Sequence, residues 1–292
     1  MKTKLSLLLV LIFISTTSLL RAQDVTNKPS ILVCGDSTAK NSGKGKNGEP
    51  VAGWGTPITD FFDASRVTVK NVGHAGKSSR TYYDGDWPKV LPQIKRGDFV
   101  LLVFGINDGS TPPGLGDETV LRNDQPVHTY GWYMSKMVVD AREKGAHVYL
   151  LTVTTRNIWT NSKVKFRDAT PIDPLPADYD SKQDKIERGT GGGKFTQWTK
   201  DIGKKLNVPV FDLTNFCADK YEAMGREGVN QLYSDHNHTY LPGAEIVATS
   251  IVSGLKAFEK SPFVPLLSEK GKAVPTADAK YVSDHSAPPA VN

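Results

Sequence analysis

The stretch Phe-Val-Leu-Leu-Val-Phe at residues 99–104 decides the fold that this sequence predicts. An unbroken apolar run of this length is typical of a strand buried on both faces, as in a parallel sheet covered by helices. Similar short runs occur on both sides of it along the chain, at residues 31–34, 67–72, 147–153 and 208–213. We therefore expect a five-stranded, mainly parallel sheet.

Segments with helical spacing of apolar residues separate these strands. They cover residues 54–62, 87–95, 131–144, 195–206 and 242–258. When strands and helices alternate with right-handed crossovers, the helices cover both faces of one sheet. The sequence thus predicts a three-layer α/β/α sandwich. Residues 156–193 are longer and more polar than an ordinary connection, which is typical of a functional or disordered loop.

The first 22 residues have the pattern of a secretory signal peptide. A basic start precedes an apolar run over residues 5–20, and Ala22 closes the segment with a small residue. The run is shorter than the ~20 residues that a membrane helix needs, which disfavours the alternative of an uncleaved anchor. We therefore expect a secreted or periplasmic protein with no stable membrane association after cleavage.

The overall composition is that of a globular protein, with 38% hydrophobic and 23% charged residues in 292. Loss of Lys2, Lys4 and Arg21 with the leader lowers the net charge from +5 to +2, so no nucleic-acid partner is expected. We place one globular domain at residues 23–260, acting as a monomer. Residues 261–292 are Pro-rich with little periodicity, and we expect an extended or partly disordered tail.

Only two cysteines are present, Cys34 and Cys217, so the chain is not a disulfide scaffold. A bridge between them stays open at this level. Two cysteines alone cannot form a structural zinc site.

Four short polar segments lie near the ends of predicted elements, where an α/β sheet carries its ligands. Ser37 follows the first strand, Gly76 the second and Asn107 the third, while Asp235 and His238 precede the last helix. A serine needs a base to become a nucleophile, and His238 is the candidate base with Asp235 three residues away. Taken singly, each segment is also compatible with an ordinary turn.

A metal site is an alternative for the fourth segment. Asp235, His236 and His238 have side chains that suit a divalent ion. No other His or Cys with ligand spacing lies nearby in the sequence, which disfavours this hypothesis.

The four segments together resemble the SGNH (GDSL) hydrolase superfamily over about residues 30–258. The segments 35–38, 53–55, 75–80, 132–142 and 235–244 resemble, more narrowly, rhamnogalacturonan acetylesterases. The superfamily's four namesake residues correspond here to Ser37, Gly76, Asn107 and His238. Ile106 departs from the pattern, because the family has His or Asn at that place.

The resemblance implies a flavodoxin-like SGNH hydrolase fold and a carbohydrate acetylesterase without metal or cofactor. Its catalytic residues are implied to be Ser37, Asp235 and His238. The oxyanion hole is implied to consist of the Ser37 N–H, the Gly76 N–H and the side chain of Asn107.

The implied substrate is an acetylated plant cell-wall polysaccharide or oligosaccharide, with pectin first and xylan second. Basic residues near the predicted site could meet galacturonate carboxylates, and aromatic rings could stack on sugars. The candidate substrate-binding residues are Trp54, Lys77, Arg80, Arg156, Trp159 and His236. Solvated lysines and core tryptophans are the alternatives for these positions.

Two other functions stay open. A lipase or thioesterase of the same superfamily requires an apolar acyl groove, and no apolar stretch in the sequence is placed to line one. A non-catalytic carbohydrate-binding protein on the same fold is the second, and the intact Ser37, Asp235 and His238 argue against it.

Overall fold

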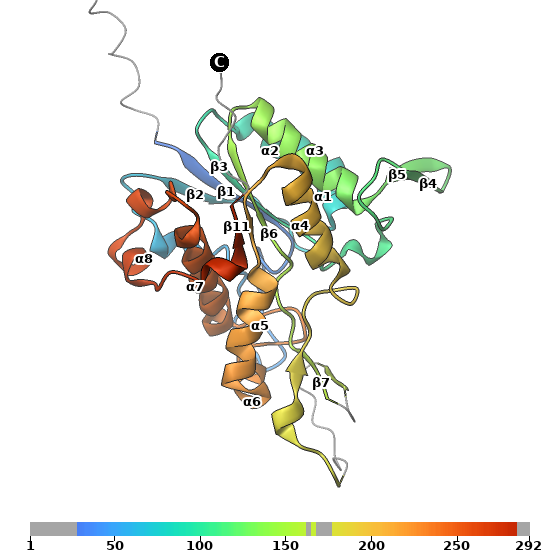
Figure 1. Ribbon diagram of the computed structural model, residues 1–292, viewed down its shortest axis with the longest axis vertical. Helices are drawn as coiled ribbons and strands as arrows, with labels where there is room; N and C mark the ends of the chain where they lie inside the picture. Colours follow the sequence, from blue (N-terminus) through green and yellow to red (C-terminus); the bar gives the residue numbers. More distant parts are fainter. Residues whose placement is uncertain (1–27, 162–164, 168–176, 285–292) are drawn as a thin grey trace, which may run out of the picture.

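A six-stranded sheet forms the centre of the computed structural model, which describes residues 28–161, 165–167 and 177–284 (Figure 1). Its order is β11-β10-β6-β3-β1-β2, and every neighbouring pair is parallel except β10 with β11. The strands are β1 (Ser30–Gly35), β2 (Thr68–Asn71), β3 (Phe99–Val103), β6 (His147–Leu151), β10 (Val210–Phe211) and β11 (Val282–Ser283). The five predicted strands and their mainly parallel arrangement are confirmed, and β11 is an additional antiparallel edge strand.

Helices cover both faces of this sheet, as predicted. On one face, Leu32 and Cys34 pack with residues from α1 (Ser79–Gly85), α2 (Trp87–Val90), α3 (Tyr130–Glu143) and α4 (Lys194–Leu206). On the other, Ile31 and Val33 pack with residues from α5 (Leu213–Met224) and α7 (Leu241–Ala257). Alternate residues of β1 thus enter different cores, which explains why its apolar run is unbroken.

Cys34 and Cys217 are free and buried, and they belong to the cores on opposite faces of the sheet. This arrangement settles the open question of a bridge between them. Burial raises the pKa of both thiols, to about 12 for Cys34 and about 11 for Cys217, so both behave as small apolar side chains.

Two predicted helices are much shorter than expected, and proline explains the second of them. The segment 54–62 forms only a 3-10 turn, Pro57–Phe61, and 87–95 divides into α2 and the 3-10 turn Leu91–Gln93. Pro92 lacks an N–H and cannot continue the α-helical hydrogen bonding. The sequence analysis did not anticipate α1, although Ser78 and Thr81 form a capping box at its start.

The long segment after β6 contains a small antiparallel sheet of order β8-β7-β9. Its strands are β7 (Ile158–Thr160), β8 (Lys165–Arg167) and β9 (Lys185–Ile186). A separate hairpin, β4 (Thr119–Arg122) and β5 (Gln125–His128), projects beside the N-terminal end of α3 (Figure 1).

The segment after residue 260 differs from the extended tail that the sequence predicts. Phe263 and Leu267 are buried in the core, and α8 (Glu269–Ala273) packs against the 57–61 turn. β11 then pairs with β10. Widely spaced apolar residues anchor this segment without any helical or strand periodicity, so the sequence pattern does not reveal them. The predicted signal peptide lies outside the described residues.

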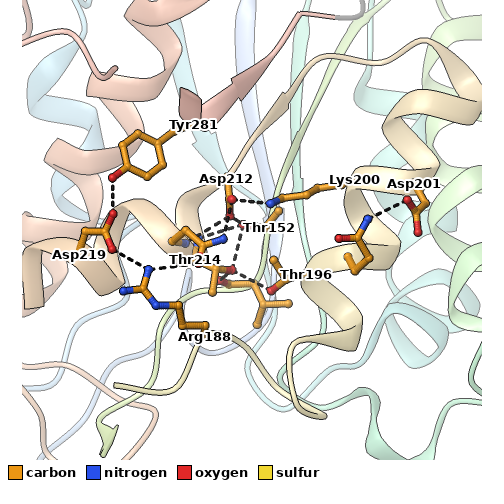
Figure 2. A network of polar contacts seen from close by, with 12 residues as sticks. Thr152, Arg188, Thr196, Lys200, Asp201, Asp212, Thr214, Asp219 and Tyr281 are labelled. Atoms are coloured by element: carbon orange, nitrogen blue, oxygen red, sulfur yellow. Dashed lines mark hydrogen bonds and ion pairs between the residues drawn. The ribbon is translucent and has the colours of Figure 1, made fainter. Parts of the chain in front are cut away.

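A buried polar network ties these late elements together at the ends of β6 and β10. We call it the threonine network, and it consists of Thr152, Thr196, Lys200, Asp212 and Thr214. Asn215 links Asp212 to Arg188, and from there the network continues through Asp219 to Tyr281 (Figure 2). Tyr281 immediately precedes β11, so the network fastens the C-terminal segment to α5.

No helix within the described part of the chain combines the length and apolar character needed to cross a membrane.

Candidate active site

The four polar segments meet at the carboxyl ends of β1, β2 and β3. β1 lies between β2 and β3 in the sheet, so the strand order reverses at this point, which is where open α/β sheets carry their ligands. Hydrogen bonds join the segments in space. The His74 N–H donates to the Gly35 carbonyl, and the Asn107 amide donates to the Lys77 carbonyl at 3.1 Å.

Ser37, His238 and Asp235 form a continuous hydrogen-bonded relay. The Ser37 hydroxyl oxygen lies 3.0 Å from Nε2 of His238, and Nδ1 of the same ring lies 2.7 Å from Oδ2 of Asp235. Ser37 stands in the turn after β1, where the Ala39 and Lys40 N–H groups return to the Asp36 carbonyl. This arrangement can activate a serine hydroxyl for attack on an ester carbonyl.

Asp235 holds its own turn in shape. Its Oδ1 accepts the backbone N–H groups of Asn237 and His238, at 2.7 and 2.8 Å. Partial burial acts to raise the pKa of this carboxyl, but the hydrogen bonds from the His238 ring and the two N–H groups outweigh it, and the pKa is lowered. Asp235 therefore stays ionised beside the imidazole.

The expected oxyanion donors lie on the loops around Ser37. Gly76 is exposed with φ +75°, and a Cβ there would enter open space, so a ligand can approach this backbone closely. Among the described residues, neither the Ser37 N–H nor the Gly76 N–H donates a hydrogen bond. Asn107 uses its amide on the Lys77 carbonyl, which also fixes the loop that carries Gly76.

Three positioning residues have no assigned role in the sequence analysis. Asn71 joins the first two segments through its amide, which donates to the Ala39 carbonyl at 2.9 Å. Asp108 joins the third to the second, because it accepts the Ser79 hydroxyl at 2.5 Å and the Ser79 N–H at 3.1 Å. Both lie within or next to the polar segments that the sequence analysis selects, and this position in the sequence could have identified them as positioning residues.

Asp36 is the third positioning residue, directly before the serine. Oδ1 of this carboxyl accepts both the N–H and the hydroxyl of Thr38 at 2.8 Å. Burial raises the pKa of Asp36 to about 6, against the opposing effect of these hydrogen bonds. Ionisation of Asp36 therefore costs free energy at this buried position. The hydrogen bonds of its carboxyl to Thr38 keep the turn around Ser37 closed.

Most of the predicted substrate contacts are unavailable in this structure. Trp54 and Trp159 are each 1% exposed, so neither ring offers a face to a sugar. The Lys77 ammonium pairs with Asp86 at 3.4 Å, and the Arg156 guanidinium binds Glu187 through two nitrogens at 2.7 and 2.9 Å. These partners neutralise the two cations that the sequence analysis placed near an acidic polymer.

Arg80 and His236 remain near the site without a demonstrated contact to substrate. Arg80 is half-buried in α1, and its Nε makes no hydrogen bond to any described residue. His236 lies beside the relay and accepts the Asn157 N–H through its carbonyl at 2.9 Å.

The metal alternative receives no geometric support. Within the residues that the structure describes, no group of three His, Cys, Asp or Glu side chains is placed to hold an ion.

Proteins of similar sequence include named esterases. A rhamnogalacturonan acetylesterase of Emericella nidulans is 26% identical over 241 residues, which cover 77% of this chain and 84% of the relative. The rhamnogalacturonan acetylesterase RhgT of Bacillus subtilis is 25% identical, with 83% and 96% covered. The probable rhamnogalacturonan acetylesterase YesY of the same organism is 30% identical, with 77% and 92% covered.

The solved structure of YxiM from Bacillus subtilis superposes with a TM-score of 0.57 at 22% identity. The match covers 79% of this chain and 56% of that one, and it supports the fold. The family model described as "GDSL-like Lipase/Acylhydrolase family" matches residues 33–241, a range that begins in β1 and ends just past His238. Because that match spans most of the chain, this protein belongs to the GDSL-like lipase/acylhydrolase family and is a carboxylic ester hydrolase.

Proposed function

We propose that this protein is an exported serine esterase that removes O-acetyl groups from a plant cell-wall polysaccharide, with pectic rhamnogalacturonan as the first candidate. The observation that carries the proposal is the relay from Ser37 through His238 to Asp235, next to backbone N–H groups that no described residue uses. The names of the relatives support acetyl as the acyl group and rhamnogalacturonan as the polymer. The leader pattern of residues 1–22 supports export.

The first half of the reaction transfers acetyl to the enzyme. Nε2 of His238 takes the Ser37 proton as Oγ attacks the acetyl carbonyl, and the Asp235 carboxylate stabilises the imidazolium through Nδ1. The carbonyl oxygen becomes an oxyanion. When the tetrahedral intermediate collapses, the sugar oxygen leaves with the proton from Nε2, and an acetyl ester remains on Ser37.

The second half returns the enzyme to its starting state. His238 removes a proton from a water molecule, whose oxygen attacks the acetyl carbonyl on Ser37. Collapse of this second intermediate returns the proton to the Ser37 oxygen and releases acetate. We expect the negative oxygen that forms in each half to accept hydrogen bonds from the N–H groups of Ser37 and Gly76 and from the Asn107 amide.

The distribution of exposed apolar side chains supports a short acyl group. The exposed large apolar side chains of the described residues are few and are spread over β4, α3, α5, α7 and the 264–266 turn: Val120, Leu121, Val139, Met224, Leu241 and Val264. A lipase or thioesterase needs a continuous apolar surface for its acyl chain. Acetyl needs only the space in front of Ser37.

Acetate release from acetylated rhamnogalacturonan and acetylated xylan, compared at equal ester concentration, tests the proposal. We expect the higher kcat/KM on rhamnogalacturonan, a preference for acetyl over octanoyl nitrophenyl esters, and no release by the Ser37→Ala variant. A preference for xylan would reassign the polymer, and a preference for octanoyl esters would favour the lipase. Binding of pectin without acetate release would support the non-catalytic alternative. Activity lost with EDTA and restored by zinc would favour the metal hypothesis.

A further inference from the structure

The loop after the serine turn carries cations that remain available to a ligand. This lysine loop, residues 40–51, contains three lysines and one glutamate. Lys44 and Lys46 are exposed, and neither makes an ion pair within the described part of the chain. Lys77 and Arg156, two of the other basic candidates, are already neutralised by Asp86 and Glu187.

The lysine loop has a defined backbone shape. The Gly45 N–H donates to the Glu49 carbonyl at 2.8 Å, and the Gly48 N–H returns to the Gly45 carbonyl at 3.0 Å. The Val51 N–H closes the base of the loop on the Gly43 carbonyl at 3.1 Å. These bonds order the backbone that carries Lys44 and Lys46.

The same loop lies directly against the segment that carries the base. The Lys46 N–H donates to the Ser234 hydroxyl at 3.0 Å, one residue before Asp235. Gly45 approaches Ser234 and Tyr240 so closely that a Cβ there would lie 2.6 Å from each. The backbone that carries Lys44 and Lys46 therefore lies against the segment that carries Asp235 and His238, within side-chain reach of a polymer bound in front of Ser37.

We propose that Lys44 and Lys46 bind the carboxylates of uronate residues that flank the acetylated sugar. The inference rests on the proposed function and adds a source of substrate preference to it. A flexible ammonium group tolerates a range of carboxylate positions, which suits a polymer whose sugars present their acid groups at varying angles. Since both lysines are exposed, the attraction is screened by salt within a Debye length of about 8 Å.

The test compares Lys44→Gln/Lys46→Gln with the wild type on acetylated uronate oligosaccharides and on the same oligosaccharides after methyl esterification of their carboxylates. At low salt we expect about a tenfold loss in kcat/KM on the charged substrate, mainly through KM. The methyl-esterified substrate and nitrophenyl acetate should change less than twofold. In 0.5 M NaCl the two enzymes should converge on the charged substrate.

Lys204→Gln/Lys205→Gln is the matched control, because it removes two exposed charges at the end of α4, which leads to the amino end of β10. Equal losses in this control would assign the effect to net charge and overturn the inference. Equal losses on charged and methyl-esterified substrates would assign the loop a structural role, and no loss on either would remove the two lysines from binding. A wild type inactive on every ester would instead overturn the proposed function.

Discussion

Two polar clusters lie at the carboxyl ends of strands in the same sheet, and they differ in what their hydrogen bonds leave unused. At the ends of β1, β2 and β3, the Ser37 and Gly76 N–H groups donate to none of the described residues. At the ends of β6 and β10, Thr214 is fully buried, and its hydroxyl donates to the Val153 carbonyl at 2.5 Å.

The threonine network satisfies its members internally. The Thr152 hydroxyl donates to Asp212 at 3.1 Å and accepts the Thr214 N–H at 2.9 Å, while the Lys200 ammonium pairs with Asp212 at 2.5 Å (Figure 2). A buried polar group with all its partners supplied by the fold stabilises structure. A polar cluster whose N–H donors have no partner within the protein can bind a ligand instead. Substitutions in the two clusters should therefore separate activity from stability.

Removal of the relay should produce the largest effect on activity. Ser37→Ala and His238→Ala should each lower kcat by about 10⁴-fold or more on nitrophenyl acetate, because the two side chains act as one unit. The double variant should be no slower than the slower single variant. A further large loss in the double variant would show that serine and histidine act independently, which contradicts the relay.

Asn107→Ala should have the next largest effect on activity. Loss of one oxyanion donor commonly lowers kcat by about 10²- to 10³-fold. Because the Asn107 amide also holds the Lys77 carbonyl at 3.1 Å, Asn107→Asp provides a second variant that preserves shape and replaces the donor by an acceptor. Both variants also lose the bond to the Lys77 carbonyl, so their urea midpoints are measured beside kcat to separate loss of the oxyanion donor from loss of stability. An unchanged kcat in both would exclude Asn107 from the oxyanion hole.

Features of the fold and the site could be predicted from the sequence where the interacting residues lie close together along the chain, and not where they lie far apart. Ser37, Asn107 and the pair Asp235 and His238 sit in short motifs at element ends, so spacing and resemblance were enough to select them. Burial of Trp159 and neutralisation of Arg156 depend on partners elsewhere in the chain, and no local pattern indicates them.

The C-terminal segment shows the same limit over a longer range. The Ser268 hydroxyl donates to the Asp60 carbonyl at 2.7 Å, across 208 positions of sequence. A contact of this kind gives the segment its fixed place without imposing helical or strand periodicity on it. The sequence analysis missed α1 for a different reason, because its capping box between Ser78 and Thr81 is local but uses a threonine in place of the usual Glu or Gln.

Asp36 belongs to the active-site cluster, yet its substitution should affect stability as well. Its folded pKa is about 6, above the ordinary value of 3.8, so the native state holds this proton longer than the unfolded chain. Its contribution therefore lowers the free energy of unfolding as pH rises from about 4 to 6. Asp36→Asn retains an oxygen for both Thr38 contacts and cannot ionise.

The difference in unfolding free energy between Asp36→Asn and the wild type should therefore shift in favour of the variant by about 2 kcal/mol between pH 4 and pH 7. Urea denaturation of both proteins across this range measures the shift. A constant difference would mean that the carboxyl titrates alike in the folded and unfolded chains.

Thr214→Val should affect stability alone, and it tests the network side of the comparison. Valine fits the same space but cannot donate to the Val153 carbonyl or bond the Thr196 hydroxyl at 3.0 Å. A buried carbonyl without its donor costs about 1–3 kcal/mol, so the urea midpoint should fall. Thr119→Val is the control, because Thr119 is exposed on β4 and its substitution should leave the midpoint almost unchanged.

The kcat of Thr214→Val on nitrophenyl acetate should stay within twofold of the wild type, since none of the hydrogen bonds of Thr214 reaches Ser37, Asp235 or His238. A drop in kcat as large as that of Asn107→Ala would show that the two clusters are coupled through the sheet, and the division between them would fail.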